Sequence, residues 1–412
     1  MNRLAEPAAQ TPFPTPWGDL GLTRFPEDPR ERLRAWDAAD EYLLRHLAGE
    51  ADSAEGRATA LAGRAITVLG DRWGALTTAL ATALAAVPVT AGPPAAVTQI
   101  SDSHLAQRAT LANLARAGAD PAAVRLLTTR DTPPERIDVL LVRVPKSLAL
   151  LEDQLHRLAP ALHPDTVVLG TGMVTEIHTS TLKLFERILG PTRTSLAVRK
   201  ARLILCTPDR ALDPGANPWP HRYALPGDIG PASGRTVTNH AGTFCADRLD
   251  IGTRFLLAHL PTAAPGARVV DLGCGNGVVG TAAALAGPGI ELLFVDESHQ
   301  AVASAEETFR ANLGPDARAE FRTADALADA DVPAGSVDLV LNNPPFHSHQ
   351  ATTDATAWRM FTGAKRALRP GGELWVVGNR HLDYHVKLRR LFGNCRTVAG
   401  SPKFVVLKAV KR

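Results

Sequence analysis

The stretch RVVDLGCGNGVVGTAAALA (268–286) decides the fold. It begins as an apolar, β-branched run, continues with glycines at alternate positions (Gly273, Gly275 and Gly277) and ends in an alanine-rich segment. This order predicts a strand, a tight turn and a helix. The glycines let the backbone turn sharply and approach a ligand closely, and the amides of the helix N-terminus point at the same place. The sequence therefore predicts an α/β fold with a ligand site in the loop after this strand.

An acid just before the glycines indicates which ligand this loop binds. Gly275, Gly277 and Gly280 satisfy the G-x-G-x-x-G pattern, so a dinucleotide dehydrogenase has to be considered. Asp271, however, stands two residues before Gly273, at the predicted strand end. A carboxylate there would repel a pyrophosphate, whereas it suits a cationic ligand such as S-adenosylmethionine. The arrangement resembles the first motif of the Rossmann-like methyltransferases.

Two further acids follow the next two predicted strands. Asp296 closes the run ELLFVD (291–296), where a carboxylate can accept hydrogen bonds from both ribose hydroxyls. Asp325, in FRTADAL (321–327), lies where the methyltransferase resemblance places contacts to adenine; taken alone, it fits a helix N-cap nearly as well. Together with Asp271, these acids predict S-adenosylmethionine as the cofactor.

A second motif, NNPPFH (342–347), follows the apolar run VDLVL (337–341). Consecutive prolines fix the backbone and remove two N–H donors; alone, they indicate only a turn after a strand. After this strand, the side-chain oxygen of Asn343 and the main-chain oxygen of Pro344 can hold the N–H groups of a planar amine without a strong base. Phe346 offers a face for an extruded base. We predict these three as catalytic residues, with Asn343 also bordering the cofactor, and His347 as a surface residue, a substrate contact or a catalytic group.

Composition and charge limit the class of protein. The chain has 412 residues, of which 45% are hydrophobic and 21% charged, as in globular proteins. Its net charge is only +3, but residues 358–412 carry 13 basic side chains against 2 acidic ones. Such a segment suits a polyanion or forms a solvated surface, and both interpretations stay open. The candidate phosphate contacts are Arg366, Arg369, Lys387, Arg389, Arg390, Arg199, Lys200 and Arg202.

The remaining features predict a cytoplasmic monomer without metal or membrane span. Four cysteines stand far apart with no C-x-x-C pair, which argues against a zinc site or disulfides. The first residues contain several prolines and no apolar core of signal-peptide length. The uncharged run 73–101 is broken by prolines, so we expect a buried helix followed by a strand.

Similar pieces recur in the two halves of the chain. The stretch AITVLGDRWGALTTALATALA (65–85) repeats the strand, turn and helix of 268–286; IDVLLVRVPK (137–146) matches VDLVLNNPPF; and VRKARLILC (198–206) matches SPKFVVLKA (401–409). Residues 206–235 are rich in Pro and Gly and lack periodicity. We therefore predict two copies of one doubly wound domain, 1–205 and 236–412, joined by a linker at 206–235.

The first copy is expected to be degenerate. Its loop carries Arg72 and Trp73, which should block a cofactor, and the Asn-Pro-Pro-Phe motif has become Arg143-Val144-Pro145-Lys146. Asp102 is interpreted as a relic of the ribose acid or as a helix cap.

With these motifs, the sequence resembles the bacterial tandem-domain ribosomal RNA guanine-N2 methyltransferases of the RsmC/RlmG type. The resemblance also rests on FCADRLDIGTRFLLAHLP (244–261), AWDAADEYLL (35–44), VPKSLALLEDQL (144–155) and IHTSTLKLFERILGPT (177–192), of which the first-half strings indicate the RlmG-like branch. It implies two tandem class I methyltransferase domains, a C-terminal one that is catalytic and an N-terminal one that holds RNA. It also implies that Leu249–Thr253 lies near the cofactor. Cys245 departs from the serine that is usual in the family.

The function expected is methyl transfer from S-adenosylmethionine to the exocyclic N2 of a guanine in ribosomal RNA, on the large subunit according to the resemblance. Methylation of a small-subunit guanine, an adenine amine or a protein glutamine uses the same two acceptors and stays an alternative. Enzymes of the last two kinds usually carry tyrosine at the position of Phe346 and lack the duplicated first half. A non-catalytic RNA-binding ribosome-assembly factor is the alternative from another class.

Overall fold

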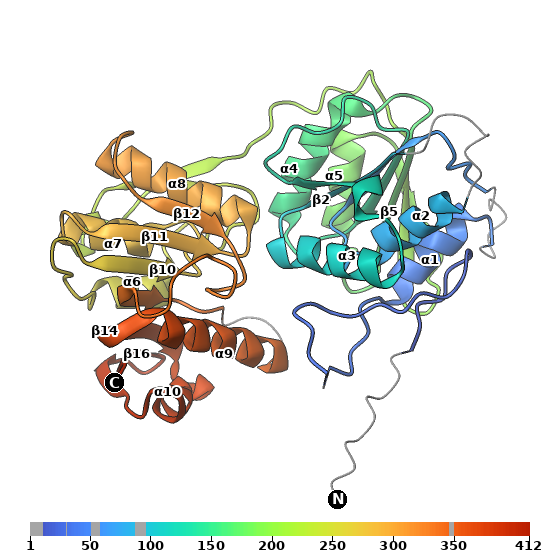
Figure 1. Cartoon of the computed structure of the whole chain (residues 1–412). Helices are drawn as coiled ribbons and strands as arrows, with labels where there is room; N and C mark the ends of the chain where they lie inside the picture. The colour runs from blue at the N-terminus through green and yellow to red at the C-terminus, as the bar shows by residue number, and fades with distance from the viewer. Residues whose placement is uncertain (1–10, 30, 51–57, 87–95, 346–349) are drawn as a thin grey trace, which may run out of the picture. The chain divides into compact units, whose positions relative to one another are not determined.

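The structure is a computed structural model that describes residues 11–29, 31–50, 58–86, 96–345 and 350–412. It divides into two compact units, Met1–Pro218 and Trp219–Arg412, which are described separately. Each unit is built around one twisted sheet flanked by helices (Figure 1). The predicted α/β fold class is thereby confirmed.

Unit 1 contains a seven-stranded sheet in the order β3-β2-β1-β4-β5-β7-β6. Strands β1 to β5 are parallel, whereas β7 runs antiparallel to β5 and β6. All five residues of the central strand β4 are buried, as expected for a parallel strand covered on both faces. The strands are β1 (Ala65–Leu69), β2 (Ala96–Ser101), β3 (Val124–Thr128), β4 (Val139–Arg143), β5 (Val167–Met173), β6 (Thr192–Thr194) and β7 (Ala201–Cys206), and the helices are α1 (Ala38–Leu47), α2 (Ala75–Ala85), α3 (His104–Arg116), α4 (Leu148–Leu158) and α5 (Thr179–Ile188).

Unit 2 contains a second seven-stranded sheet, in the order β12-β11-β10-β13-β14-β16-β15. Here β16 runs antiparallel to β14 and β15, and the other pairs are parallel. The strands are β10 (Arg268–Leu272), β11 (Glu291–Asp296), β12 (Glu320–Thr323), β13 (Val337–Asn342), β14 (Leu368–Asn379), β15 (Arg396–Gly400) and β16 (Phe404–Val410), and the helices are α6 (Ile251–Leu257), α7 (Val278–Ala286), α8 (His299–Leu313), α9 (Gln350–Ala367) and α10 (Tyr384–Phe392).

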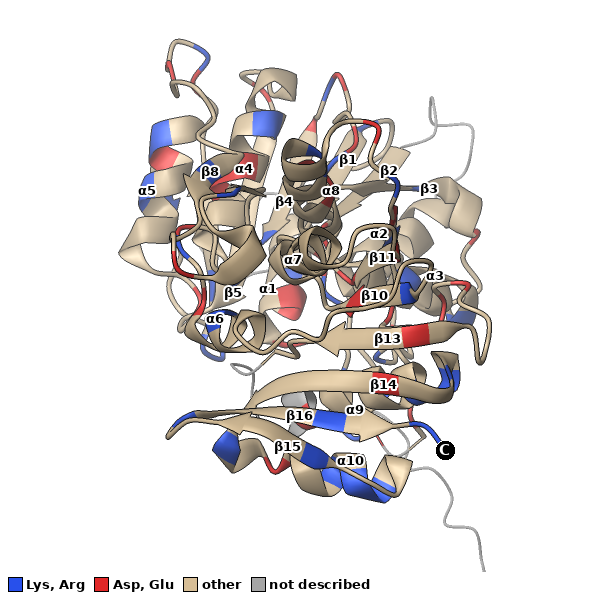
Figure 2. Ribbon diagram, turned by 90° about the vertical axis from the view of Figure 1, so that its left-hand side faces the viewer, with Lys and Arg blue, Asp and Glu red and all other residues tan. Residues whose placement is uncertain are grey.

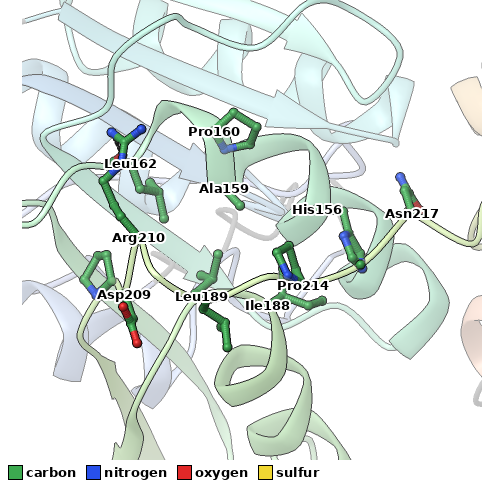
Figure 3. A pocket seen from close by; sticks show the side chains of 13 residues that line it. His156, Ala159, Pro160, Leu162, Ile188, Leu189, Asp209, Arg210, Pro214 and Asn217 are labelled. Atoms are coloured by element: carbon green, nitrogen blue, oxygen red, sulfur yellow. Dashed lines mark hydrogen bonds between the residues drawn. The ribbon is translucent and has the colours of Figure 1, made fainter.

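The two units divide within the stretch that was predicted as a linker, 206–235. Strand β8 (His221–Ala224) lies in this stretch and pairs with β9 (Thr236–Asn239) of unit 2. On the other side, Arg210 donates to the carbonyl of Leu162 at 3.3 Å, which ties the chain to unit 1. Residues 208–217 of this stretch and the C-terminal ends of α4 and α5 line a hollow of about 360 Å³ (Figure 3).

Other expectations from the sequence can be compared with the described residues. The run 73–101 forms helix α2 and strand β2, as predicted, and its residues 87–95 lie outside the described part. Within the described residues, no helix is both long and apolar enough to cross a membrane. All four cysteines are free thiols.

Candidate functional site

The predicted Gly-rich turn joins β10 to α7. Gly273, Gly275 and Gly277 have φ angles of 71°, 52° and 74°, in the left-handed region that glycine adopts without strain. A Cβ atom on Gly277 would lie 2.7 Å from the backbone of Ala305, so this glycine permits close packing of α7 against α8. A Cβ atom on Gly275 would meet nothing within 4 Å, so the backbone there faces open space. The loop therefore leaves room for a ligand at Gly275.

Asp271 lies beneath this loop rather than at its surface. Its side chain is 2% exposed, and the amide of Gly280 donates to its Oδ2 at 2.8 Å. Burial raises its pKa to about 8, with a contribution from the negative charge of Asp296, although the bond from Gly280 opposes the shift. Since the bond comes from the first turn of α7, Asp271 fixes the start of that helix against β10.

Asp296, at the end of β11, accepts two backbone hydrogen bonds. The amide of Gly275 donates to Oδ2 at 3.0 Å, and that of Ser298 donates to Oδ1 at 3.1 Å. Burial raises the pKa of this carboxyl above its ordinary value, and the two backbone bonds oppose that shift. Unlike Asp271, the residue stays partly exposed. The structure thus brings Asp296 to the Gly-rich loop, as the strand-end positions predict.

Asp325 follows β12 and is 7% exposed. One carboxylate oxygen lies 3.2 Å from Nε of Arg359 on α9. The residues after Asp325 form a turn rather than a helix, so the interpretation as a helix N-cap is wrong.

The amide group of Asn343 is held by a short chain of hydrogen bonds. Its Nδ2 donates to Oγ1 of Thr253 at 3.0 Å, and that hydroxyl donates in turn to Oδ2 of Asp250 at 3.3 Å. Asp250 is the N-cap of α6, where it also accepts from the amide of Thr253 at 2.9 Å. Because the single hydroxyl hydrogen points to a carboxylate, Thr253 offers Asn343 only lone pairs, and the amide must present its NH₂ group.

This orientation leaves the other end of the amide available. Oδ1 of Asn343 is a buried atom with no hydrogen-bond partner among the described residues. Such an orphaned acceptor is costly unless a ligand satisfies it. Pro344 is buried, whereas Phe346 and His347 lie outside the described residues.

The family resemblance implies that Leu249–Thr253 lies near the cofactor, but the contact of Thr253 with Asn343 was not predicted. The Asp-x-x-Thr spacing is a capping signal that can be read in the sequence. Its hydrogen bond to a residue 90 positions further along the chain cannot. Asn342, the residue before Asn343, is fully buried and donates to the carbonyl of Leu272 at 2.7 Å, so it ties β13 to β10.

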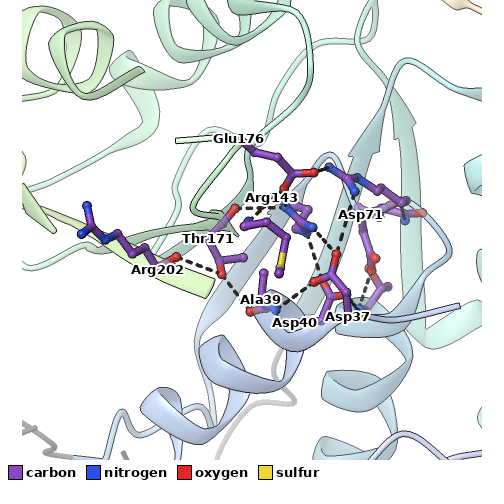
Figure 4. Close-up of polar contacts among 12 residues, drawn as sticks. Asp37, Ala39, Asp40, Asp71, Arg143, Thr171, Glu176 and Arg202 are labelled. Atoms are coloured by element: carbon purple, nitrogen blue, oxygen red, sulfur yellow. Dashed lines mark hydrogen bonds and ion pairs between the residues drawn. The ribbon is translucent and has the colours of Figure 1, made fainter. Parts of the chain in front are cut away.

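Unit 1 has a different structure at the corresponding positions. Leu69 pairs with Val142 in unit 1, as Leu272 pairs with Asn342 in unit 2, so the next residue, Arg143, occupies the position of Asn343. Figure 4 shows that Arg143 is surrounded by acids from several elements. Its guanidinium nitrogens lie 2.6 Å from Asp37, 3.2 Å from Asp40 and 2.8 Å from Glu176.

Burial and the ion pairs with Arg143 together shift the pKa values of the acids in this cluster. Burial raises the pKa of Asp40 to about 7, although the charge of Arg143 opposes the shift. Burial would also raise the pKa of Glu176, but Arg143 lowers it to about 2. Arg72, expected to fill the loop, lies 2.6 Å from Glu176 and belongs to the same cluster. Side chains of unit 1 thus satisfy one another at this position.

The sequence interpretation of Asp102 is wrong in both of its forms. Ile100 pairs with Leu69 as Val295 pairs with Leu272, so the next residue, Ser101 and not Asp102, stands at the position of Asp296. The N-cap of α3 is Ser103, and Asp102 accepts from the hydroxyl of Thr129 at 3.0 Å.

The described residues contain no group of three or more His, Cys, Asp or Glu side chains that could hold a metal ion. Both sheets, with six strands in one direction and an antiparallel strand inserted beside the edge, have the architecture of class I Rossmann-like methyltransferases. A solved structure of the T. thermophilus 16S rRNA N2 G1207 methyltransferase (RsmC), in complex with AdoMet and guanosine, matches with a TM-score of 0.70. The match covers 98% of each chain at 21% identity, so it supports the fold.

Comparisons of sequence identify the family. The RLMG N-terminal domain matches residues 10–210, and the Methyltransferase small domain matches residues 234–408. A ribosomal RNA large subunit methyltransferase G from Streptomyces avermitilis is 71% identical over 97% of this chain and 99% of its own. One from Ectopseudomonas mendocina is 48% identical over the same shares. The chain belongs to the ribosomal RNA large subunit methyltransferase G family, which confirms the resemblance to the RlmG-like branch.

Proposed function

We propose that unit 2 transfers a methyl group from S-adenosylmethionine to the exocyclic N2 of a guanine in large-subunit ribosomal RNA. Family membership supports the class of reaction and the class of RNA. The observation that carries the chemistry is the amide of Asn343, whose Oδ1 is buried and without a partner while its NH₂ group is held by Thr253.

The residues present fit this cofactor. The open space at Gly275 lets a ligand reach the loop backbone, and Asp296 reaches that loop from the next strand. When bound there, S-adenosylmethionine supplies an electrophilic methyl group on a sulfonium. We assign Asp296 to the ribose hydroxyls, Asp325 to the adenine side of the site, and Gly273, Gly275, Gly277 and Asp271 to the loop that receives the cofactor.

Asn343 is assigned to the substrate amine. Its Oδ1, together with the main-chain oxygen of Pro344, accepts the two N–H groups and so directs the nitrogen lone pair along one line. Held in this way, the nitrogen would take the methyl group from a bound sulfonium, whose sulfur would keep the electron pair of the carbon–sulfur bond, and the amine would lose one proton to solvent water. An amide does not take up this proton, so the arrangement works by orientation and hydrogen bonding, without a general base of its own. Phe346 is assigned to stacking of the extruded base.

The proposal is tested by incubating the purified protein with methyl-labelled S-adenosylmethionine and ribosomal RNA or subunits from a strain that lacks it. Digestion to nucleosides should give labelled N2-methylguanosine, mapped to one position of the large-subunit RNA. Asn343→Ala should slow the transfer at least about 100-fold. Arg318→Ala, an exposed position before β12, serves as the control. Label on adenine, on protein or on small-subunit RNA would contradict the proposal.

We further propose that unit 1 is a duplicated and degenerate copy that holds RNA and no longer binds cofactor. The identical order of strands in the two sheets supports duplication. The cluster around Arg143 supports the loss of cofactor binding, because ion-paired side chains meet where unit 2 leaves an acceptor open. Calorimetry should give one S-adenosylmethionine per chain, and Asp296→Ala should abolish that binding. Two equivalents would contradict the loss.

We also propose that the protein acts in the cytoplasm as a monomer, because its substrate is ribosomal RNA and each unit has its own core. Light scattering coupled to size exclusion should give a mass close to the 43.8 kDa of one chain.

A further inference from the structure

The basic side chains of the C-terminal segment fall into two groups in the structure. Several are engaged within unit 2: Arg366 donates to the carbonyl of Leu327 at 2.6 Å, and Arg369 lies 2.5 Å from Asp338. Helix α10, in contrast, carries Lys387, Arg389 and Arg390 and no acid in its sequence YHVKLRRLF. Figure 2 shows this concentration of basic residues on α10. Helix α10 therefore concentrates three basic side chains on a short stretch without an acid.

An aromatic side chain borders these cations. Trp358 on α9 is 37% exposed, and Val386 on α10 is 55% exposed. With Lys387 and Arg390 they line a hollow of about 390 Å³. The guanidinium carbon of Arg390 lies 5.8 Å from the centre of the Trp358 ring, close enough for a cation–π contact. We call these four residues, together with the neighbouring Arg389, the α9–α10 patch.

The charges of the patch are only partly neutralised. Lys387 lies 2.6 Å from Asp354 on α9. Among the described residues, neither Arg389 nor Arg390 is paired with a carboxylate, and both are exposed. An exposed tryptophan beside an arginine without a carboxylate partner suits single-stranded nucleic acid, because a base can stack on the ring while the cation contacts a phosphate.

We propose that the α9–α10 patch binds a single-stranded segment of the RNA next to the modified guanine, with one base stacked on Trp358 and phosphates at Lys387, Arg389 and Arg390. The proposal rests on the proposed function, since it takes RNA as the substrate. A protein partner fits the patch less well, because it would need acids placed opposite Arg389 and Arg390, whereas any RNA strand supplies phosphates at every nucleotide.

Helix α9 links the patch to the candidate site. Met360, on the same helix, faces the Gly-rich loop: a Cβ atom on Gly273 would lie 2.8 Å from its Cε. Trp358 stands two residues earlier, about 200° around the helix, so it faces away from the loop. The helix is about 10 Å thick, which sets the separation between loop and patch at that order. Nucleotides that flank the modified base span such a distance.

The test measures binding of the full chain to a fluorescein-labelled 20-nucleotide oligouridylate by anisotropy, at several salt concentrations. Trp358→Ala should weaken binding about 5- to 100-fold, the range for removal of one stacked base. Trp358→Phe keeps a stacking face and should stay within about threefold of the wild type. Arg390→Ala should lower the slope of log Kd against log salt by about 0.7. Arg318→Ala, beside the opposite edge strand β12, is the control and should change neither.

Two results would overturn the proposal: Trp358→Ala binding the oligonucleotide like Arg318→Ala, or Trp358→Phe losing as much affinity as Trp358→Ala. Calorimetry with S-adenosylmethionine shows whether each variant keeps its cofactor site. Methylation of ribosomal RNA by the wild type is measured separately. If the wild type methylates guanine but the patch variants bind RNA normally, the patch is wrong and the proposed function stands. If the patch variants lose affinity for RNA but the wild type does not methylate guanine, the patch stands and the proposed function is refuted.

Discussion

Replacing Thr253 with valine tests whether the orientation of the Asn343 amide matters for catalysis. The substitution keeps the shape of the side chain and removes the hydroxyl that accepts from Nδ2 of Asn343 at 3.0 Å. It leaves the N-cap of α6 in place, because Asp250 still accepts from the main-chain amide of residue 253. The variant should therefore fold, with a melting temperature close to that of the wild type.

The size of the effect follows from the bond that is lost. A neutral hydrogen bond contributes about 0.5–1.5 kcal/mol net, and each 1.4 kcal/mol corresponds to a factor of about ten in rate. Without the bond, the amide of Asn343 spends a share of its time with the NH₂ group, instead of Oδ1, facing the substrate amine. We expect kcat to fall about 2- to 10-fold. This is less than the at least about 100-fold expected for Asn343→Ala, which removes the acceptor itself.

The assay is steady-state methylation of large-subunit RNA, with kcat and the KM for S-adenosylmethionine determined separately. Thr253→Ser keeps a hydroxyl at the same position and should restore most of kcat, whereas KM should change little in either variant. A Thr253→Val enzyme with the kcat of the wild type would falsify the orientation argument. Equal losses in the serine and valine variants would show instead that the methyl group, and hence packing, is what matters.

Three other predictions concern the Gly-rich loop, the buried Asp271 and the ion-pair cluster around Arg143. Gly275→Ala should weaken S-adenosylmethionine binding more than tenfold in calorimetry; Gly266→Ala has the same left-handed strain and open surroundings and should leave that affinity unchanged. The pKa of Asp271 is raised in the folded state to about 8, so its charged form destabilises the fold. The free energy of unfolding therefore falls as the pH rises from about 4 to about 8. Asp271→Asn should thus raise the free energy of unfolding by a few kcal/mol at pH 8 and by little at pH 4; equal effects in urea titrations at both pH values would refute this. Arg143→Met should cost about 3–5 kcal/mol by leaving buried acids unpaired, against less than about 1 kcal/mol for Arg136→Met at an exposed pair; similar costs would show that the cluster does not stabilise unit 1.

The features that can be predicted from this sequence are those encoded by neighbouring residues. The turn at 273–277 needs left-handed backbone angles at alternate positions, and only glycine adopts them without strain, so its pattern is visible in the chain itself. Asp296 was predicted for the same reason, because it directly follows the apolar residues of its own strand, β11. The position of Asp271 was predicted for the same reason. That it lies buried beneath the loop was not, because burial depends on how α7 packs on the sheet.

What could not be predicted depends on pairing between distant segments. Asp102 looks like the counterpart of Asp296 because both are acids near a strand end, yet the register of β1 with β2 shifts it by one residue and places Ser101 there. The sequence match already places Arg143 at the position of Asn343, and the pairing of β1 with β4 agrees, but the partners of the two side chains could not be predicted. A buried arginine must be paired with acids, which come from segments more than 100 and more than 30 residues away. A catalytic amide must keep one atom unpaired for its substrate. One position in one fold thus holds an ion-paired arginine in unit 1, whereas in unit 2 it holds the amide that we propose for the chemistry, and the difference lies in which atoms the neighbouring segments leave unsatisfied.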